Sequence, residues 1–239
     1  MGRAYCSGVA LMVRTLEETV EWSCLWQRGP DAVSYAQGQL TQDVGTPSAH
    51  DRTALLEPDG TVIVAGLLRV TEEAVGVVVP REHLDTALAR LRRFRLRARV
   101  EFIVEDVAQS PWPRWIDLVR DLWPGPLELA GALSPASYGA SFVSRAVSLT
   151  KGCYTGQELV ARLDARGARV PFRMVRVGVA DPDVLEELDA SLRRGPAGPT
   201  GLTTVVATPS GAEALGFAHR SWTVPETMAE SVLDTTSAG

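Results

Sequence analysis

The sequence predicts an α+β fold, and three observations support this. Runs of β-branched and other apolar residues, typical of strands, extend over residues 54–79 and again over 172–179. Between them, Leu84, Leu88 and Leu91 recur at helical spacing and form one apolar stripe. Turn sequences such as Pro58-Asp59-Gly60 separate the strand-like runs.

Composition limits the classes of function. The 239 residues are 45% hydrophobic and 22% charged, as in ordinary soluble globular proteins. Lys+Arg 24 against Asp+Glu 29 gives a net charge of -5, so no overall charge attracts nucleic acid or an anionic membrane. No apolar run reaches the roughly 20 residues that span a bilayer. The first residues do not resemble a signal peptide, and we expect a cytoplasmic protein.

The cysteines indicate neither a disulfide framework nor a metal site within this chain. Cys6, Cys24 and Cys153 are odd in number and lack the C-x-x-C spacing of zinc and iron–sulfur ligands. We therefore expect no bound metal, unless a cluster is shared with a partner.

The N-terminal half is expected to begin with a weak strand and then a helix. Gly29-Pro30-Asp31 gives a helix start, Val33, Ala36 and Leu40 lie at helical spacing, and the helix is expected to end at or near Gly38. The residues around Gly38, 37–43, read Gln-Gly-Gln-Leu-Thr-Gln-Asp. On local evidence a polar loop after the helix is the favoured interpretation, and a loop that faces a ligand is the alternative.

Basic residues are concentrated from Arg90 to Arg99. Apolar and mostly arginine positions alternate over 94–102, which predicts a strand after the helix that contains Leu84. A solvated surface is the favoured interpretation of the arginines. The alternative is an anion-binding surface for RNA phosphates or a polycarboxylate tail.

The second half is expected to contain an irregular connection and then helices and strands. Prolines and tryptophans alternate over 109–135, which indicates a subdomain boundary with tryptophans packed across it. A short helix over 159–163, a strand over 172–179, a helix over 181–192 and strands over 202–207 and 214–218 follow.

The densest chemistry lies in Lys151-Gly152-Cys153-Tyr154-Thr155-Gly156-Gln157-Glu158. Thr155 and Glu158 fit a capping box at a helix start, which would present a positive dipole beside Cys153. That dipole and Lys151 would favour the thiolate of Cys153. For Cys153 or Tyr154 taken singly, a place in the core before a capped helix is the competing interpretation.

These residues carry a family resemblance. Lys-Gly-Cys-Tyr-x-Gly-Gln-Glu at 151–158 resembles the signature of the YgfZ family of folate-binding proteins, and the stretch 37–43 is similar to that family's Gln-Gly-Gln-(Leu/Val)-Thr-x-Asp. The family is related to the glycine-cleavage T-protein (aminomethyltransferase) and to mitochondrial iron–sulfur assembly factors. The similarity is loose outside the two motifs.

The resemblance implies a T-protein-like arrangement of three subdomains around a central folate channel. Its expected parts are an N-terminal folate-binding α+β region (1–110), a middle region that ends in the motif and its helix (111–165), a small C-terminal β-barrel (166–225) and a disordered tail (226–239).

The resemblance also implies tetrahydrofolate, or another folate, as cofactor, and it suggests residue roles. Cys153 would be the reactive thiol and Lys151 its activator. The residues expected to contact the cofactor are Gln39, Asp43, Tyr154, Gln157 and Glu158.

We expect a monomeric accessory protein for iron–sulfur enzymes, including tRNA-modifying ones. Where aminomethyltransferases have a catalytic aspartate, the corresponding run here is Gly-Thr-Val-Ile-Val-Ala at 60–65. Valine cannot move a proton, which disfavours the first alternative, a tetrahydrofolate-dependent aminomethyl or methyl transferase. The second alternative is an RNA-binding module that uses Arg90 to Arg99.

Overall fold

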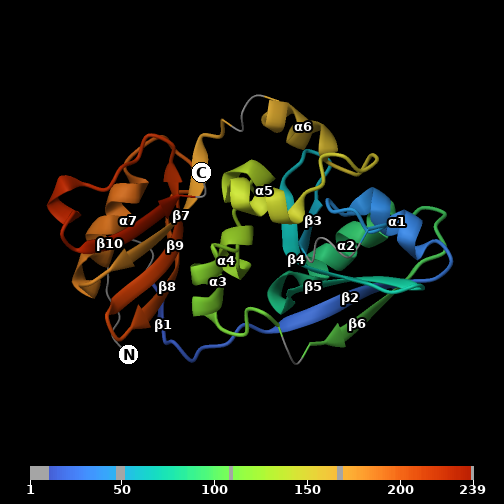
Figure 1. The fold of residues 1–239 in the computed structure, drawn as a ribbon, viewed down its shortest axis with the longest axis horizontal. Coiled ribbons are helices and arrows are strands. Elements are labelled where there is room, and N and C mark those ends of the chain that lie inside the picture. Colours follow the sequence, from blue (N-terminus) through green and yellow to red (C-terminus); the bar gives the residue numbers. More distant parts are fainter. Residues whose placement is uncertain (1–10, 47–51, 108–109, 166–168, 238–239) are drawn as a thin grey trace.

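Two five-stranded sheets are joined by a layer of short helices (Figure 1). The computed structural model describes residues 11–46, 52–107, 110–165 and 169–237; Cys6 lies outside these ranges. The N-terminal sheet has the order β3-β4-β5-β2-β6 with antiparallel neighbours. Its strands are β2 (Trp22–Arg28), β3 (Arg52–Leu56), β4 (Val62–Val70), β5 (Ala74–Pro80) and β6 (Glu101–Asp106). This mixture of sheets and helices confirms the α+β prediction.

Two helices pack on the N-terminal sheet. Helix α1 (Ala32–Gln39) ends next to Gly38, as expected, and helix α2 (Leu84–Phe94) follows the 3-10 turn η1 (Arg81–His83). The strand predicted over 94–102 is wrong, because Phe94 ends α2 and β6 begins only at residue 101. Leu96 has a left-handed backbone (φ 43°) and is 88% exposed, so the chain turns there instead of extending.

The middle layer contains helices α3 (Trp115–Asp121), α4 (Pro126–Leu129) and α5 (Ala140–Ala146) and the 3-10 turn η2 (Pro135–Tyr138). The irregular connection expected over 109–135 is thus partly helical. Contacting aromatic rings, with centroids 5.0–5.9 Å apart, run from β2 in one sheet to β9 in the other. In order they are Trp22, Trp112, Trp123, Phe142, Tyr138 and Phe217. The tryptophan packing expected across this boundary is confirmed, and these rings join the two sheets in one core.

The C-terminal sheet has the order β1-β8-β9-β7-β10 and is antiparallel except where β1 pairs with β8. It is built from β1 (Val13–Arg14), β7 (Phe172–Val179), β8 (Gly201–Thr208), β9 (Gly211–His219) and β10 (Val232–Ser237), and helix α7 (Leu185–Arg193) packs on it after the turn η3 (Pro182–Val184). In the described residues this region is a five-stranded sheet, and the small barrel stays a prediction. Strand β1 joins it from the other end of the chain.

The tail expected to be disordered contains structure. The 3-10 turn η4 (Glu226–Met228) precedes β10, which pairs with β7 from Val232 to Ser237. Met228 is buried in the core of the C-terminal sheet. The polar composition of the tail suggested disorder, but strand pairing satisfies its backbone. None of the helices in the described part of the chain is long and apolar enough to cross a membrane.

Candidate functional site

The two polar motifs, 114 residues apart at their starts by sequence number, meet along one seam. We call residues 37–43 together with 148–157 the motif seam. The ammonium Nζ of Lys151 donates to the carbonyl oxygens of Leu40 and Gln42, each at 2.8 Å. The amide of Thr155 donates to the Gly38 carbonyl at 3.0 Å. Backbone and side-chain bonds therefore fix the two motifs against each other.

The first motif also closes the free edge of β3. Leu40 forms an isolated antiparallel bridge with Leu55, and the amide of Thr41 donates to the Ala54 carbonyl at 3.0 Å. The Thr41 hydroxyl donates to the Ala146 carbonyl at 2.6 Å and accepts from the Ala54 amide at 2.8 Å. The motif is thus an ordered extension of the sheet, as a site on a rigid scaffold requires.

Glycine packing explains part of the second motif. Gly156 has φ +85°, and a Cβ there would lie 2.6 Å from the Glu57 carbonyl oxygen. Helix α6 (Gln157–Ala165) starts after this glycine, so Thr155 is not its N-cap and the predicted capping box is wrong. The Thr155 amide bonds to Gly38 instead, and Glu158 pairs with Arg162 on the exposed side of the helix.

Lys151 is buried, with 8% of its surface exposed, and it is the only lysine in the sequence. Burial lowers the pKa of its amine to about 8, and the carboxylate of Asp43 opposes this shift. The hydrogen bonds of Nζ hold the two motifs together, so Lys151 has a structural task. Its activation of Cys153 stays a prediction.

Asp43 orders the loop that ends the first motif. Its carboxylate accepts from the Thr46 hydroxyl at 2.7 Å, the Gly45 amide at 2.9 Å and Nε2 of Gln37 at 2.9 Å. These hydrogen bonds, that from Thr46 first, hold the pKa of the carboxyl below its usual range. Asp43 is therefore ionised near neutral pH and already engaged by this chain.

Gln39 and Gln157 have their amide oxygens held by protein donors. Oε1 of Gln39 accepts from Nη1 of Arg90 at 3.1 Å, and Oε1 of Gln157 accepts from the Tyr154 amide at 3.4 Å. Neither Nε2 donates to a residue that the structure describes. Both half-buried side chains are therefore able to donate hydrogen bonds to a ligand.

The remaining predicted site residues differ in exposure. Cys153 is exposed, whereas Cys24 is buried and its pKa is raised to about 12, mainly by burial. Tyr154 is buried, which raises its pKa to about 12, and its hydroxyl has no hydrogen-bond partner among the described residues. Glu158 is exposed and pairs with Arg162, so its carboxylate is directed away from the seam, unlike the other residues predicted to contact the cofactor.

Three of the arginines from Arg90 to Arg99 are buried or paired with carboxylates. Arg90 is buried, Arg93 pairs with Glu57, and Arg99 forms hydrogen bonds through its guanidinium with Asp31. These engaged arginines leave less positive charge for RNA than the sequence suggests.

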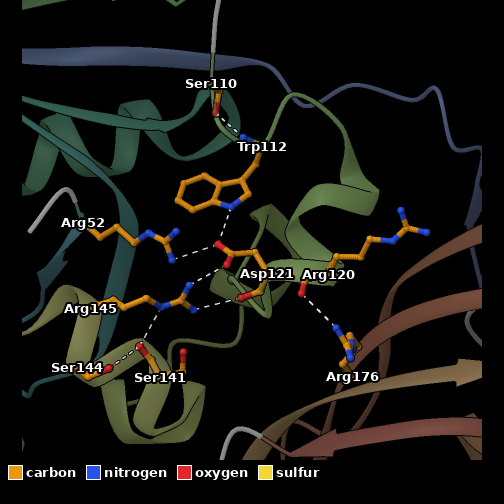
Figure 2. Close-up of polar contacts among 9 residues, drawn as sticks. All are labelled: Arg52, Ser110, Trp112, Arg120, Asp121, Ser141, Ser144, Arg145 and Arg176. Atoms are coloured by element: carbon orange, nitrogen blue, oxygen red, sulfur yellow. Dashed lines mark hydrogen bonds and ion pairs between the residues drawn. The ribbon is translucent and has the colours of Figure 1, made fainter.

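A second polar cluster was missed by sequence reasoning (Figure 2). The Asp121 carboxylate accepts from Nε1 of Trp112 and Nη1 of Arg145, each at 2.8 Å, and forms an ion pair with Nη1 of Arg52 at 3.1 Å. Arg52 and Arg145 also lie over the ring of Trp123, at 4.9 and 5.3 Å from its centroid. The cluster joins β3, α3 and α5.

Three hollows on the described surface lie away from the motif seam. Hollows of about 620 and 550 Å³ lie beside Gly29 and Pro30, and one of about 460 Å³ lies between Arg120 and Thr208. None of the three is lined by a seam residue. Within the described ranges, no group of three His, Cys, Asp or Glu side chains is arranged to hold a metal ion.

Comparison with known proteins places the fold. No family model matches the chain. A Haemophilus influenzae protein described as uncharacterized is 27% identical over 59% of this chain and 65% of its own length, so the match spans less than two thirds of that relative. Glycine cleavage system aminomethyltransferase T from Bartonella henselae has a crystal structure that matches with a TM-score of 0.52 and 13% identity. The match covers 89% of this chain and 81% of that one. This chain has a T-protein fold.

Proposed function

We propose that this T-protein-fold chain is a tetrahydrofolate-binding accessory protein of the YgfZ type, which supports iron–sulfur cluster assembly or repair. The observation that carries the proposal is the motif seam, where the two stretches that resemble that family are fixed together by Lys151. The arrangement of three subdomains around a folate channel, ending in a small barrel, belongs to the same proposal.

The donor set of the seam fits a folate. A pterin ring presents hydrogen-bond acceptors and donors along one edge, and side-chain amides can match them. Among the residues that the structure describes, neither Nε2 of Gln39 nor that of Gln157 has an acceptor, and the Tyr154 hydroxyl has no partner. When bound, the folate would supply one-carbon or redox chemistry, while these side chains would bind and orient it.

The seam is less suited to proton transfer. In β4, Val62, Val64 and Ala65 have aliphatic side chains that pack in the core, so this part of the run 60–65 has no acid to offer the site. Asp43 is engaged by Gly45 and Thr46 of its own loop and by Gln37 of helix α1. A general acid or base must reach the reacting proton, and these residues therefore favour an accessory role over catalysis.

A transferase is the second candidate, because the solved structure with the same fold is named an aminomethyltransferase. Incubation with methylene-tetrahydrofolate and candidate amines tests it. Turnover that survives dialysis and is lost in Asp43→Asn would support the transferase and overturn the accessory role.

Calorimetric titration with tetrahydrofolate tests the ligand. We expect binding by the wild type, and at least tenfold weaker binding by Gln39→Ala and Gln157→Ala, since each removes a donor to the ligand. The control is Arg97→Ala, which changes an exposed residue outside the seam. No binding by the wild type would overturn the folate assignment. Unchanged affinity in both glutamine variants would move the site elsewhere.

Gene deletion tests the accessory role. We propose that the protein acts as a cytoplasmic monomer on iron–sulfur clients, including tRNA-modifying enzymes. Their activities are expected to fall on deletion and to return with the wild-type gene or with Cys24→Ala, but not with Cys153→Ala, because only Cys153 of this pair is exposed. Unchanged client activities on deletion would refute this role.

A further inference from the structure

Arg90 is a buried cation whose hydrogen-bonding capacity is incompletely used. Only 3% of its surface is exposed, and its guanidinium lies 3.8 Å from the centroid of the Phe94 ring. Its Nε forms an ion pair with a carboxylate oxygen of Glu57 at 3.6 Å, a separation too long for a hydrogen bond. Nε and Nη2 are buried without a hydrogen-bond partner in the described part of the chain. Burying donors without acceptors costs stability, so the two unmet donors offset part of what the Glu57 ion pair and the Phe94 contact contribute.

The hydrogen bond that Arg90 does make is to the motif seam. Nη1 donates to Oε1 of Gln39 at 3.1 Å. A guanidinium has only donors, so the atom of Gln39 that faces it must be the oxygen. Turning the amide over would place its NH₂ group against the N–H groups of Arg90. Arg90 therefore keeps Nε2 of Gln39 directed away from itself.

We propose that Arg90 is a positioning residue that makes the Gln39 amide a hydrogen-bond donor toward the ligand. The site then selects a ligand that presents a carbonyl oxygen over one that presents an amino group at the same place. Gln157 reinforces this selection, because its oxygen accepts from the Tyr154 amide and its Nε2 is also left to donate. The inference rests on the proposed function for the class of ligand.

Folates allow this polarity to be tested by a single substituent. Tetrahydrofolate has a carbonyl oxygen at position 4 of its pterin ring, and its 4-amino-4-deoxy analogue has an amino group there. A donor-only amide can bond to the oxygen but meets another donor in the analogue. Sites built to hydrogen-bond one group discriminate strongly against its loss. We expect the wild type to bind tetrahydrofolate at least tenfold more tightly than the analogue.

The experiment is calorimetric titration of both compounds into four proteins, each with its thermal midpoint measured. In Arg90→Met the amide of Gln39 is free to turn, and the preference should fall below threefold. The thermal midpoint should stay equal or rise, since methionine can pack against Phe94 without a buried charge. Arg90→Lys keeps a donor and should retain most of the preference. The matched control Arg93→Met removes an exposed arginine that also pairs with Glu57, and it should retain the full preference.

A second variant keeps the test decisive if Arg90→Met does not fold. Gln39→Glu keeps an oxygen for Arg90 but offers only acceptors to the ligand, so the preference should reverse toward the amino analogue. A folded Arg90→Met protein with the wild-type preference, or Gln39→Glu with an unreversed one, would overturn the positioning role. Equal wild-type affinity for both compounds would overturn it as well while folate binding stands. Binding of neither compound would refute the proposed function itself.

Discussion

Replacing Lys151 by methionine tests how the two motifs are held together. Methionine has a similar length and no charge, so the change removes the two hydrogen bonds from Nζ to the carbonyls of Leu40 and Gln42. Both carbonyls belong to the first motif of the seam, in the part of the chain between α1 and β3. We expect a less stable protein in which residues 37–43 no longer dock on the second motif.

The magnitude follows from two opposing terms. Hydrogen bonds to a charged group contribute about 1.5–3 kcal/mol each, so losing two removes roughly 3–6 kcal/mol. Against this, the variant no longer buries an ammonium group. The pKa of Lys151 falls from 10.5 to about 8 on folding, and each unit is worth about 1.4 kcal/mol, which gives at most ~3.5 kcal/mol and about half of that after allowing for partial contact with solvent. The net loss should be roughly 1–4 kcal/mol at pH 7.

The same pKa shift predicts a pH dependence. The folded pKa of Lys151 lies below the unfolded one, so between pH 8 and 10.5 the unfolded chain holds more protons than the folded chain. The free energy of unfolding of the wild type should therefore rise across this window relative to Lys151→Met. Below pH 8, the difference in free energy of unfolding between the wild type and the variant should not change with pH.

Urea denaturation of both proteins from pH 7 to pH 10.5 measures the difference, and the variant cancels the titration of other groups. Because Lys151 is the only lysine, protein labelled with ¹³C at the lysine ε-carbon gives a single lysine signal whose pH titration reports the pKa directly. A pKa at or above 10.5, or equal stability of the two proteins at pH 7, would refute the role assigned to the buried amine.

Three further outcomes are expected. Gly156→Ala should lower the free energy of unfolding in urea by roughly 2–4 kcal/mol, because the backbone there has a positive φ and an added Cβ would collide with the turn after β3. The control Gly152→Ala adds a Cβ in open space and should change stability by less than about 1 kcal/mol. Equal losses in the two variants would contradict this packing. Iodoacetamide should modify exposed Cys153 at least tenfold faster than buried Cys24, as followed by mass spectrometry, and comparable rates would show that β2 opens readily. Asp121→Ala should lower the free energy of unfolding by about 3 kcal/mol, because Arg52, Arg145 and the indole of Trp112 lose the carboxylate that they share. A loss below about 1 kcal/mol in thermal or urea unfolding would show that the cluster is dispensable for stability.

The sequence determined the elements whose signal is local. The valine-rich runs predicted β4 and β5, the leucine stripe predicted α2, and the tryptophan-rich stretch predicted an aromatic boundary. The density of polar groups marked 151–158 as a candidate site, and the family resemblance added 37–43; the structure brings the two stretches into contact. Residue type and spacing suffice for such features because they depend on neighbours along the chain.

The tertiary structure decided whatever depends on partners distant in the sequence. Arg90 belongs to a basic run that predicted solvation, yet packing of α2 buries it against Gln39. The partners of Asp121 come from β3 and α5. The polar tail forms strand β10, whose backbone pairs with β7. Thr155 has a local capping pattern, but the carbonyl of Gly38 competes for its amide. Burial and hydrogen bonding at these positions are set by segments that the fold brings together, which local sequence patterns do not encode.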